Sequence, residues 1–337
     1  MVIKIGKKNI GGNNPSFIIA EIGINHEGNI GICKKLIKSA KKAGADAVKL
    51  QTNIPEKNYV KGSESYKIFK KSFLDKDDIK KIFNFSKKLG INIFSTSTDL
   101  ETLKFVDKLK PIGHKISSSS LTNIPLIKET AKKNRIIILS TGMATKKDIN
   151  NAINAIKKIN KKIILMHCIS LYPTPLEKTN LRTINWIKKK YNFITGYSDH
   201  TKDNLPIILS IATGASLIEK HFTNDIKRKG FDHSISYDEK KFKEMVMKVR
   251  QVEEILGVED KILSKEEIKN SYRLQRIIVS KFNLKINEKI TINNIDIKRP
   301  LKSVKGIKPY LVKKILGKKL KKNIKKDTPI KATLLKK

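Results

Sequence analysis

Cysteine is scarce in this chain: only Cys33 and Cys168 occur among 337 residues. Neither belongs to a CxxC pair, which excludes a zinc ribbon and a CxxC redox motif, and two cysteines argue against a disulfide scaffold. Long apolar runs are also missing, since no segment approaches the roughly 18 consecutive apolar residues of a membrane span. The first residues, MVIKIGKKNI, lack the apolar core of a signal peptide. We therefore expect a cytoplasmic protein with no membrane partner.

Arginine is the second scarce residue, with only seven among the 72 basic residues. A net charge of +41 could indicate a nucleic-acid partner, because basic proteins bind phosphate backbones. However, arginine is the residue preferred for bidentate phosphate and base contacts. The lysines instead alternate with apolar residues at helical spacing, as in 34–42 and 146–162, which is typical of solvated helix faces. We expect no nucleic-acid partner and keep a polyanion-binding protein as the non-enzymatic alternative.

A glycine-rich nucleotide loop is absent as well, because neither GxGxxG nor GxxxxGK[ST] occurs. What is present is an alternation of short β-branched runs with amphipathic stretches. The runs are 17–22, 46–51, 91–96, 112–118, 135–141, 162–168, 193–198 and 216–222, and the stretches lie near 30–43, 75–89, 99–109, 124–134, 146–159, 180–190, 203–213 and 238–255. Eight strand-then-helix units of this length predict a closed (β/α)₈ TIM barrel. An open doubly wound sheet is the alternative, and it usually carries the missing nucleotide loop.

The barrel pattern does not cover the whole chain. Residues 1–16 predict a short N-terminal β-hairpin with GGNN at 11–14 as its turn. The barrel domain is then 17–256. A charged segment, 257–275, follows as a linker that could be partly helical. Short apolar runs between turns over 276–337 predict a small C-terminal domain.

Each predicted strand ends in polar side chains. Because the active site of a (β/α)₈ barrel lies at the carboxyl ends of its strands, these side chains should gather at one mouth. Charged groups on buried strands are costly, so stability alone would not select them. The strand ends carry Glu21, Asn25, His26, Lys49, Gln51, Ser95, Thr96, Lys115, Ser117, Ser118, Ser140, Thr141, His167, Ser170, Tyr172, Ser198, Asp199, His200, Glu219, Lys220 and His221.

The types of these residues indicate a chemistry. Lys49 and Lys115, with several hydroxyls, could form a cationic pocket for a phosphate or carboxylate. His200 and His221 end neighbouring strands and could bind one divalent metal ion. Asp199 and Glu219 adjoin these histidines and could orient metal-bound water. Glu21 could act as a base or bind a sugar hydroxyl. A metal beside a lysine-lined anion pocket fits carbon–carbon bond formation with a phosphorylated enol.

Several motifs together resemble the sialic acid synthase family, in order and over nearly the whole chain. The motifs are AEIGINHEG (20–28), VKLQT (48–52), FSTST (94–98), HKISSS (114–119), ILSTGM (138–143), LMHCISLYPTP (165–175), GYSDHT (196–201), IEKHFT (218–223) and KGFDHS (229–234). The C-terminal segment, with DIKRP (296–300) and ILGKKL (315–320), resembles the antifreeze-like SAF domain of that family.

The resemblance implies an enzyme that condenses phosphoenolpyruvate with an N-acetylated amino sugar, either N-acetylmannosamine or a 2,4-diacetamido sugar. The product would be N-acetylneuraminate, legionaminate or pseudaminate, with phosphate released. It also implies metal binding by His200 and His221, usually of Mn²⁺ with Mg²⁺ or Co²⁺ as substitutes, and orientation of metal-bound water by Glu219. The residues that match the phosphoenolpyruvate pocket are Lys49, Thr96, Lys115, Ser118, Ser140 and Ser198.

The family pattern assigns the sugar site as well. Gln51, Tyr172 and Asp232 match sugar-binding positions, with Glu21 near the reacting centre. Arg299 matches an arginine that reaches the active site of the partner subunit and recognises the N-acetyl group. The resemblance therefore implies a domain-swapped homodimer.

This sequence departs from the family pattern at three positions. Ser120 stands where an acidic residue is common, Ser170 where many members have asparagine, and Leu301 where glycine usually follows KRP. A serine cannot replace a carboxylate base, so a homologue with lost or altered activity is one alternative. A different phosphoenolpyruvate-dependent synthase acting on a sugar phosphate is another, although such barrels generally lack the C-terminal module.

Overall fold

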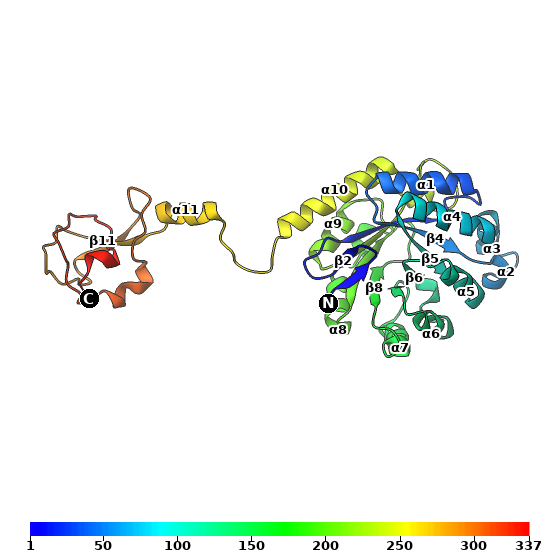
Figure 1. The fold of residues 1–337 in the computed structure, drawn as a ribbon, viewed down its shortest axis with the longest axis horizontal. Coiled ribbons are helices and arrows are strands. Elements are labelled where there is room, and N and C mark those ends of the chain that lie inside the picture. Colours follow the sequence, from blue (N-terminus) through cyan, green and yellow to red (C-terminus); the bar gives the residue numbers. More distant parts are fainter. Residues whose placement is uncertain (337) are drawn as a thin grey trace. The chain divides into compact units, whose positions relative to one another are not determined.

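The barrel predicted from the sequence is the central feature of the computed structural model, which describes residues 1–336 (Figure 1). Within these residues, eight parallel strands pair in sequence order, and β10 pairs with β3 to close the ring. The strands are β3 (Phe17–Gly23), β4 (Ala47–Thr52), β5 (Asn92–Ser97), β6 (Gly113–Ile116), β7 (Ile136–Ser140), β8 (Ile163–Cys168), β9 (Ile194–Asp199) and β10 (Leu217–His221). The predicted (β/α)₈ architecture is confirmed.

Helices cover the outside of the barrel in Figure 1. Within residues 1–336, a helix follows each barrel strand, as the amphipathic stretches predicted. They are α1 (Ile30–Lys42), α4 (Lys76–Leu89), α5 (Leu100–Lys108), α6 (Ile124–Lys132), α7 (Lys146–Ile156), α8 (Arg182–Tyr191), α9 (Leu205–Ala212) and α10 (Glu239–Leu256). Local sequence fixes where several begin. Asp75 accepts a hydrogen bond from the Asp78 amide, and Thr145 forms a capping box with Asp148.

An insertion between β4 and α4 was not predicted. It contains two short helices, α2 (Pro55–Asn58) and α3 (Glu64–Lys71). Pro55 occupies the first turn of α2, where a missing amide hydrogen costs nothing, and the Ser63 side chain caps α3. The two helices are short, with four and eight residues, and α3 buries none of its side chains, so neither contributes to the apolar core.

The strands are apolar on both faces because each is enclosed on both sides. One face packs against the helices, for example through Ile18 and Val48. The other fills the barrel interior, where Phe17 and Phe94 meet edge to face with ring centroids 6.4 Å apart. Most polar residues of the strands lie toward their carboxyl ends, with Asn92, His114 and Thr195 as exceptions near the amino ends, so the apolar core forms the floor of the site.

The N-terminal hairpin pairs β1 (Ile3–Ile5) with β2 (Lys8–Ile10), but its turn is not the predicted GGNN segment. Ile5 pairs with Lys8, so the turn consists of Gly6 and Lys7, with Gly6 at φ +58°. GGNN instead connects β2 to β3, because the hairpin ends earlier than the glycine-rich signal suggested. Ile5 and Ile10 are fully buried in the same cluster as the barrel interior, so the hairpin closes the amino-terminal end of the barrel.

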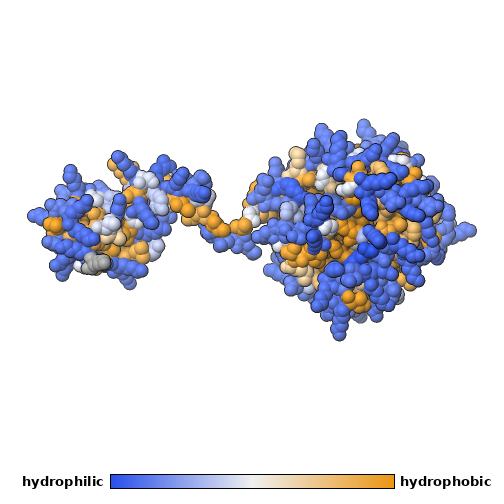
Figure 2. Space-filling view, viewed as in Figure 1, coloured by the Kyte–Doolittle hydropathy of each residue, from blue (hydrophilic) through white to orange (hydrophobic). Residues whose placement is uncertain are grey.

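The chain divides into two compact units, Met1–Val258 and a second unit that begins at Glu259. The second unit contains α11 (Lys265–Leu274), β11 (Ile277–Ser280) and β12 (Ile295–Lys298), with 3₁₀ turns at Pro309–Lys314 and Ala332–Leu334. Its own core includes Ile278, Leu284, Ile290, Leu320 and Ile330. Hydrophilic residues cover most of the face of each unit drawn in Figure 2. No helix in residues 1–336 has the length and apolar character needed to cross a bilayer.

Candidate functional site

A cavity of about 370 Å³ lies at the carboxyl ends of the barrel strands. Most of the site residues predicted from the sequence line it, and they come from all eight strands or from the loops that follow them. The lining includes Glu21, Lys49, Gln51, Thr96, Lys115, Ser118, Ser140, Tyr172, Ser198, His200, Glu219 and His221. The strand-end pattern therefore identified one continuous site.

Several of the predicted residues do not line this cavity, namely Asn25, His26, Ser95, Thr141, His167, Asp199, Lys220, Asp232 and Arg299. Asp232 is in the loop between β10 and α10, and its Oδ2 is 3.5 Å from Nδ1 of His221, so it adjoins the cavity. Arg299 lies in the second unit, directly after β12.

Four buried charges form the centre of the cavity. Nζ of Lys49 lies 2.9 Å from Oε2 of Glu21 and 2.8 Å from Oε1 of Glu219. Nζ of Lys115 lies 3.0 Å from the same Glu219 oxygen. All four side chains are at most 5% exposed, so water screens them little and their mutual interactions are strong. Although the chain carries a large positive charge, this cluster balances two ammonium groups with two carboxylates.

The environment shifts the pKa values within this cluster. Burial lowers the pKa of Lys49 to about 7, because the charged ammonium group is desolvated there. Burial opposes ionisation of Glu219, but the ammonium groups of Lys115 and Lys49 outweigh it and hold the pKa of Glu219 below its usual value. Burial raises the pKa of Asp232 to about 6. Such perturbed groups gathered in one cavity are typical of an active site.

Hydroxyl groups surround the two lysines, and several lack partners. Within residues 1–336, neither Oγ1 of Thr96 nor Oγ of Ser140 makes a hydrogen bond, although both atoms are buried. Oγ of Ser118 accepts from the Gly142 amide at 3.1 Å and lies 3.1 Å from Sγ of Cys168. Buried polar groups are normally paired, so the free hydroxyls indicate room for a ligand rich in oxygen atoms.

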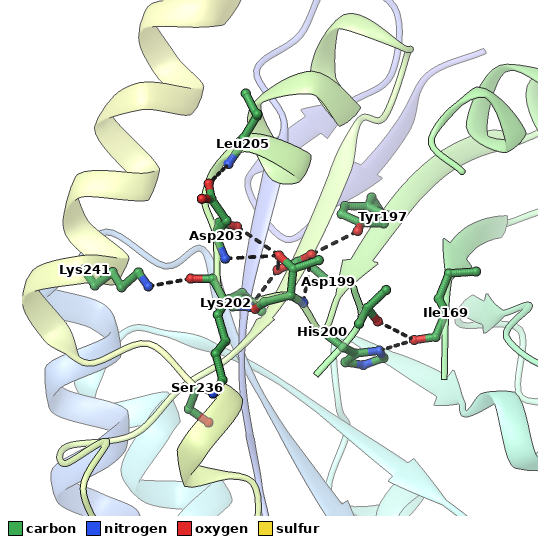
Figure 3. Close-up of polar contacts among 12 residues, drawn as sticks. Ile169, Tyr197, Asp199, His200, Lys202, Asp203, Leu205, Ser236 and Lys241 are labelled. Carbon is green, nitrogen blue, oxygen red and sulfur yellow. Dashed lines mark hydrogen bonds and ion pairs between the residues drawn. The ribbon is translucent and has the colours of Figure 1, made fainter. Parts of the chain in front are cut away.

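The two predicted metal-binding histidines come together at the rim of this cluster. Their ring centroids are 5.6 Å apart. Nδ1 of His200 donates to the Ile169 carbonyl oxygen at 2.7 Å, as Figure 3 shows, which leaves its Nε2 available. Nδ1 of His221 has no hydrogen-bond partner in the described part of the chain. Burial lowers the pKa of both histidines, so both are neutral near pH 7, the form that binds metals.

The donor set is small for a metal centre. Across residues 1–336, no group of three or more His, Cys, Asp or Glu side chains is arranged to hold a metal ion. Two neutral imidazoles, each with an unpaired ring nitrogen, nevertheless fit an open metal site. In such a site, water and substrate oxygens complete the coordination.

Asp199 does not line the cavity, contrary to the expectation that it flanks the metal position. Its carboxylate accepts hydrogen bonds from Lys220 at 2.6 Å and from Thr201 at 3.1 Å. It also accepts from the Tyr197 hydroxyl at 2.9 Å, as Figure 3 shows. Asp199 and Lys220 are both fully buried, and Nζ of Lys220 lies 4.3 Å from the Tyr237 ring centroid. The alternation of side chains along a strand places these two residues on the opposite face from Ser198 and Glu219.

The strand-end pattern missed some lining residues. Tyr59, Ser65 and Phe69 come from the α2–α3 insertion, and the rings of Tyr59 and Phe69 are stacked with centroids 4.6 Å apart. Met143 comes from the loop after β7. These residues lie beyond the strands, so only a prediction of the insertion itself could have brought Tyr59 and Phe69 to the cavity.

The three positions that depart from the family pattern have different environments. Ser170 lines the cavity. Ser120 is buried behind its neighbours Ser117 and Ser119, which do line it. Leu301 is 98% exposed within the second unit.

Comparisons with known proteins agree with this geometry. The NeuB family model matches residues 36–261, and the SAF domain model matches residues 275–336. Uncharacterized protein MJ1065 of Methanocaldococcus jannaschii is 41% identical over 326 residues, covering 96% of each chain. The N,N'-diacetyllegionaminic acid synthase of Campylobacter jejuni is 34% identical over 330 residues, covering 93% of this chain and 98% of its own.

A solved structure is similar too. The N-acetylneuraminic acid (sialic acid) synthetase of Leptospira borgpetersenii, solved in complex with citrate, superimposes with a TM-score of 0.78 at 34% identity. The match covers 81% of this chain and 97% of that one. The chain thus belongs to the NeuB family and is a transferase of the sialic acid synthase type, with a barrel followed by a SAF domain.

Proposed function

We propose that this enzyme condenses phosphoenolpyruvate with an N-acetylated amino sugar to give a nonulosonic acid and phosphate. The observation that carries the proposal is the buried pair Lys49 and Lys115, surrounded by unpaired hydroxyls and adjacent to two neutral imidazoles. The lysines suit the phosphate and carboxylate of phosphoenolpyruvate, and the imidazoles lie where a sugar aldehyde could meet its enol carbon.

Phosphoenolpyruvate would bind through Lys49, Lys115 and the hydroxyls of Thr96, Ser118, Ser140 and Ser198. Without a ligand, both lysines form ion pairs with Glu219 or Glu21. An incoming phosphate must therefore share these ammonium groups with the carboxylates. That sharing is possible because each ammonium group has three donors. Fixed cations in a buried cavity stabilise the charge that develops on the departing phosphate.

A divalent metal ion, which we propose to be Mn²⁺, would be held by His200 and His221. When bound, it would supply Lewis-acid polarisation of the sugar aldehyde. The protein's contribution is to keep both imidazoles neutral by burial and to fix the His200 ring through the Ile169 carbonyl oxygen. Glu219, beside the histidines, would orient the water that attacks.

The sugar would lie between the histidines and the outer part of the cavity. Gln51, Tyr172 and Asp232 are the proposed contacts, with Glu21 next to the reacting atoms. Gln51 Nε2 donates to Glu21 Oε1 at 3.0 Å, which holds the Glu21 carboxylate toward the cavity. Because Ser120 cannot act as a base, we assign the proton transfer at the reacting atoms to Glu21.

The reaction balances with water as the third reactant. The enol carbon C3 of phosphoenolpyruvate forms a bond to the aldehyde carbon, and the aldehyde oxygen takes a proton to become a hydroxyl. Water adds to C2 and loses its proton, which gives a tetrahedral hemiketal phosphate. The C2–O bond to phosphate then breaks, and the phosphate leaves with the electron pair. The C2 hydroxyl gives up its proton to the departing phosphate, and a ketone remains at C2.

Arg299 would act in the cavity of a second copy of the chain, in a domain-swapped homodimer, and recognise the N-acetyl group. Support comes from the SAF domain match and from the place of Arg299 directly after β12. Mixing two inactive variants, Lys115→Met and Arg299→Ala, tests this proposal. A mixed dimer that regains activity supports a shared site, whereas two variants that stay inactive after subunit exchange contradict it.

Phosphate release is the direct test of the reaction. The purified protein is assayed with phosphoenolpyruvate and Mn²⁺ against N-acetylmannosamine, its 6-phosphate and 2,4-diacetamido-2,4,6-trideoxy sugars. Release that needs one of the sugars and stops with a chelator supports the proposal, with Lys115→Met as an inactive control. No release with any of these sugars, from protein shown to bind Mn²⁺, would overturn it and favour a homologue with altered activity.

A further inference from the structure

The segment Asn25–Gly28 after β3 has no role in the reaction described above, yet it contacts the loop that carries Asp232. This β10–α10 loop comprises residues 224–236. Its two ends are joined, because the Thr223 amide donates to the Tyr237 carbonyl oxygen and the Tyr237 amide donates to the His221 carbonyl oxygen, both at 2.9 Å. Residues 224–230 between them are exposed. The return half of the loop, with Asp232, therefore needs other contacts to hold it.

Asn25 supplies the first set of contacts. Its Nδ2 donates to the Phe222 carbonyl oxygen at 3.0 Å and to Oγ of Ser236 at 2.9 Å, on the two sides of the loop. Its Oδ1 accepts from the Asp232 amide at 3.0 Å. Ser236 in turn donates to the Asp232 carbonyl oxygen at 2.6 Å. Asn25 is 1% exposed, so water does not compete for these bonds.

Glu27 and His233 supply the second set. Oε1 of Glu27 lies 3.0 Å from Nε2 of His233, and Oε2 accepts from Arg228 at 2.7 Å. Nδ1 of His233 lies 2.8 Å from Oγ1 of Thr223. Glu27 therefore contacts both halves of the loop, through Arg228 in the exposed half and His233 in the return half. His233 in turn contacts Thr223, just after β10.

Together these contacts hold the backbone of Asp232 and leave its carboxylate to the cavity. The amide and carbonyl of Asp232 are both bonded, whereas its Oδ2 lies 3.5 Å from Nδ1 of His221. Gly23 opens the space beside it, since a Cβ at that position would come within 3.0 Å of Glu21 Oε1 and 3.6 Å of Asp232 Oδ2. The carboxylate thus reaches the region where the sugar is proposed to bind.

We propose that Asn25, Glu27 and His233 are positioning residues that clasp the β10–α10 loop and hold Asp232 at the cavity. The effect on catalysis rests on the proposed function, in which Asp232 binds the sugar. A loop that is ordered before binding does not need to lose conformational freedom when the sugar arrives, so the clasp contributes to sugar affinity. It does not contact the lysines, so phosphoenolpyruvate binding should not depend on it.

Hydrogen exchange of the free protein tests the clasp without any activity assay. Glu27→Ala removes the contacts to His233 and Arg228, and it keeps a Cβ at this left-handed backbone position (φ 53°). We expect faster exchange in residues 224–236, with the barrel strands unchanged. Lys229→Ala, at an exposed position of the same loop, is the matched control and should leave exchange as in the wild type. Equal protection of the loop in Glu27→Ala and wild type would overturn the clasp.

Steady-state kinetics test its consequence. Glu27→Ala should raise the KM of the sugar about tenfold, with the KM of phosphoenolpyruvate within about twofold of wild type. Glu27→Gln keeps an acceptor for His233 and should recover most of the loss. Adding Asp232→Asn to Glu27→Ala should cost less than the two separate losses combined, because both act through one carboxylate.

The outcomes separate the two proposals. Equal rises in both KM values, or full additivity with Asp232→Asn, would overturn the positioning role. A wild type that is inactive with every sugar would count against the proposed function. The clasp would then be tested by hydrogen exchange alone.

Discussion

Two buried charge clusters include adjacent residues of β10, Glu219 and Lys220, and they differ in how completely their hydrogen bonds are made. Glu219 faces the cavity with Lys49 and Lys115, whereas the next residue, Lys220, faces the helices and pairs with Asp199. Burial is similar in the two clusters, so the cost of desolvation is similar as well. The clusters differ in how many of their polar groups have hydrogen-bond partners.

In the outward cluster the polar groups are matched. Asp199 accepts from Lys220, Tyr197 and Thr201, and Lys220 also donates to the Thr201 carbonyl oxygen. In the cavity, by contrast, Thr96 Oγ1, Ser140 Oγ and His221 Nδ1 have no partner within residues 1–336. A matched network stabilises the fold, whereas buried groups left unpaired indicate a ligand that completes them. The same strand therefore carries structural and functional charges at adjacent positions.

Lys115→Met should produce the largest effect on activity. It removes a cation from the proposed phosphate site and keeps a side chain of similar length, so we expect kcat/KM to fall about a thousandfold. The free energy of unfolding should fall by less than in Lys220→Met, because Glu219 retains the Lys49 ammonium group and the Ser198 hydroxyl as partners. Phosphate release and urea unfolding measure the two quantities. Activity near that of wild type would contradict the assignment of the cavity.

Lys220→Met should reverse this pattern. It leaves the Asp199 carboxylate fully buried without its cation, and breaking a buried pair in this way costs about 3–5 kcal/mol of unfolding free energy. We expect a large shift of the urea midpoint and a smaller effect on the activity of the folded fraction than Lys115→Met causes. If the two variants lose stability equally, the distinction between a matched and an unmatched cluster is wrong.

The sequence predicted the barrel because strands enclosed on both faces and amphipathic helices leave strong periodic patterns. It also predicted the mouth, since charged residues such as Lys49 and Glu219 at the ends of apolar runs are costly without a purpose. It did not separate Glu219 from Lys220, because both are charged, both are buried and only the strand alternation decides which one faces the cavity.

Two other features escaped the sequence analysis for local reasons. The helices of the α2–α3 insertion have only four and eight residues and lie outside the eight strand-then-helix units, so nothing in the pattern placed Tyr59 and Phe69 at the cavity. The hairpin turn at Gly6 was hidden by the stronger glycine signal at 11–14, which marks the next connection.

Gly142→Ala sharpens the comparison between cavity and surface. Its φ is not in the left-handed region, but an added Cβ would meet Ser170 Oγ at 2.4 Å, Ser118 Oγ at 2.7 Å and Cys168 Sγ at 2.9 Å. The side chains must shift, so we expect the KM of phosphoenolpyruvate to rise about tenfold.

Gly62→Ala is the opposite case and serves as its control. Gly62 has φ +90° with nothing within 4 Å of an added Cβ, so only backbone strain, about 1 kcal/mol, should result. Its kinetic constants should match those of wild type. A loss of phosphoenolpyruvate affinity in Gly62→Ala but not in Gly142→Ala would show that crowding near Ser118 is not what limits binding.

Ser120→Glu should give the smallest effect, a several-fold change in turnover or in the preference between sugars. Ser120 is buried and does not line the cavity, but its Oγ is 3.4 Å from Oγ of Ser117, which does. A glutamate at this position adds a longer, charged side chain next to a residue that lines the cavity. Ser120→Gln matches the size without the charge and is the control. If Glu and Gln change the kinetics alike, the effect comes from side-chain volume. If only Glu does, Ser120 marks the place where this enzyme dispenses with a carboxylate and relies on Glu21.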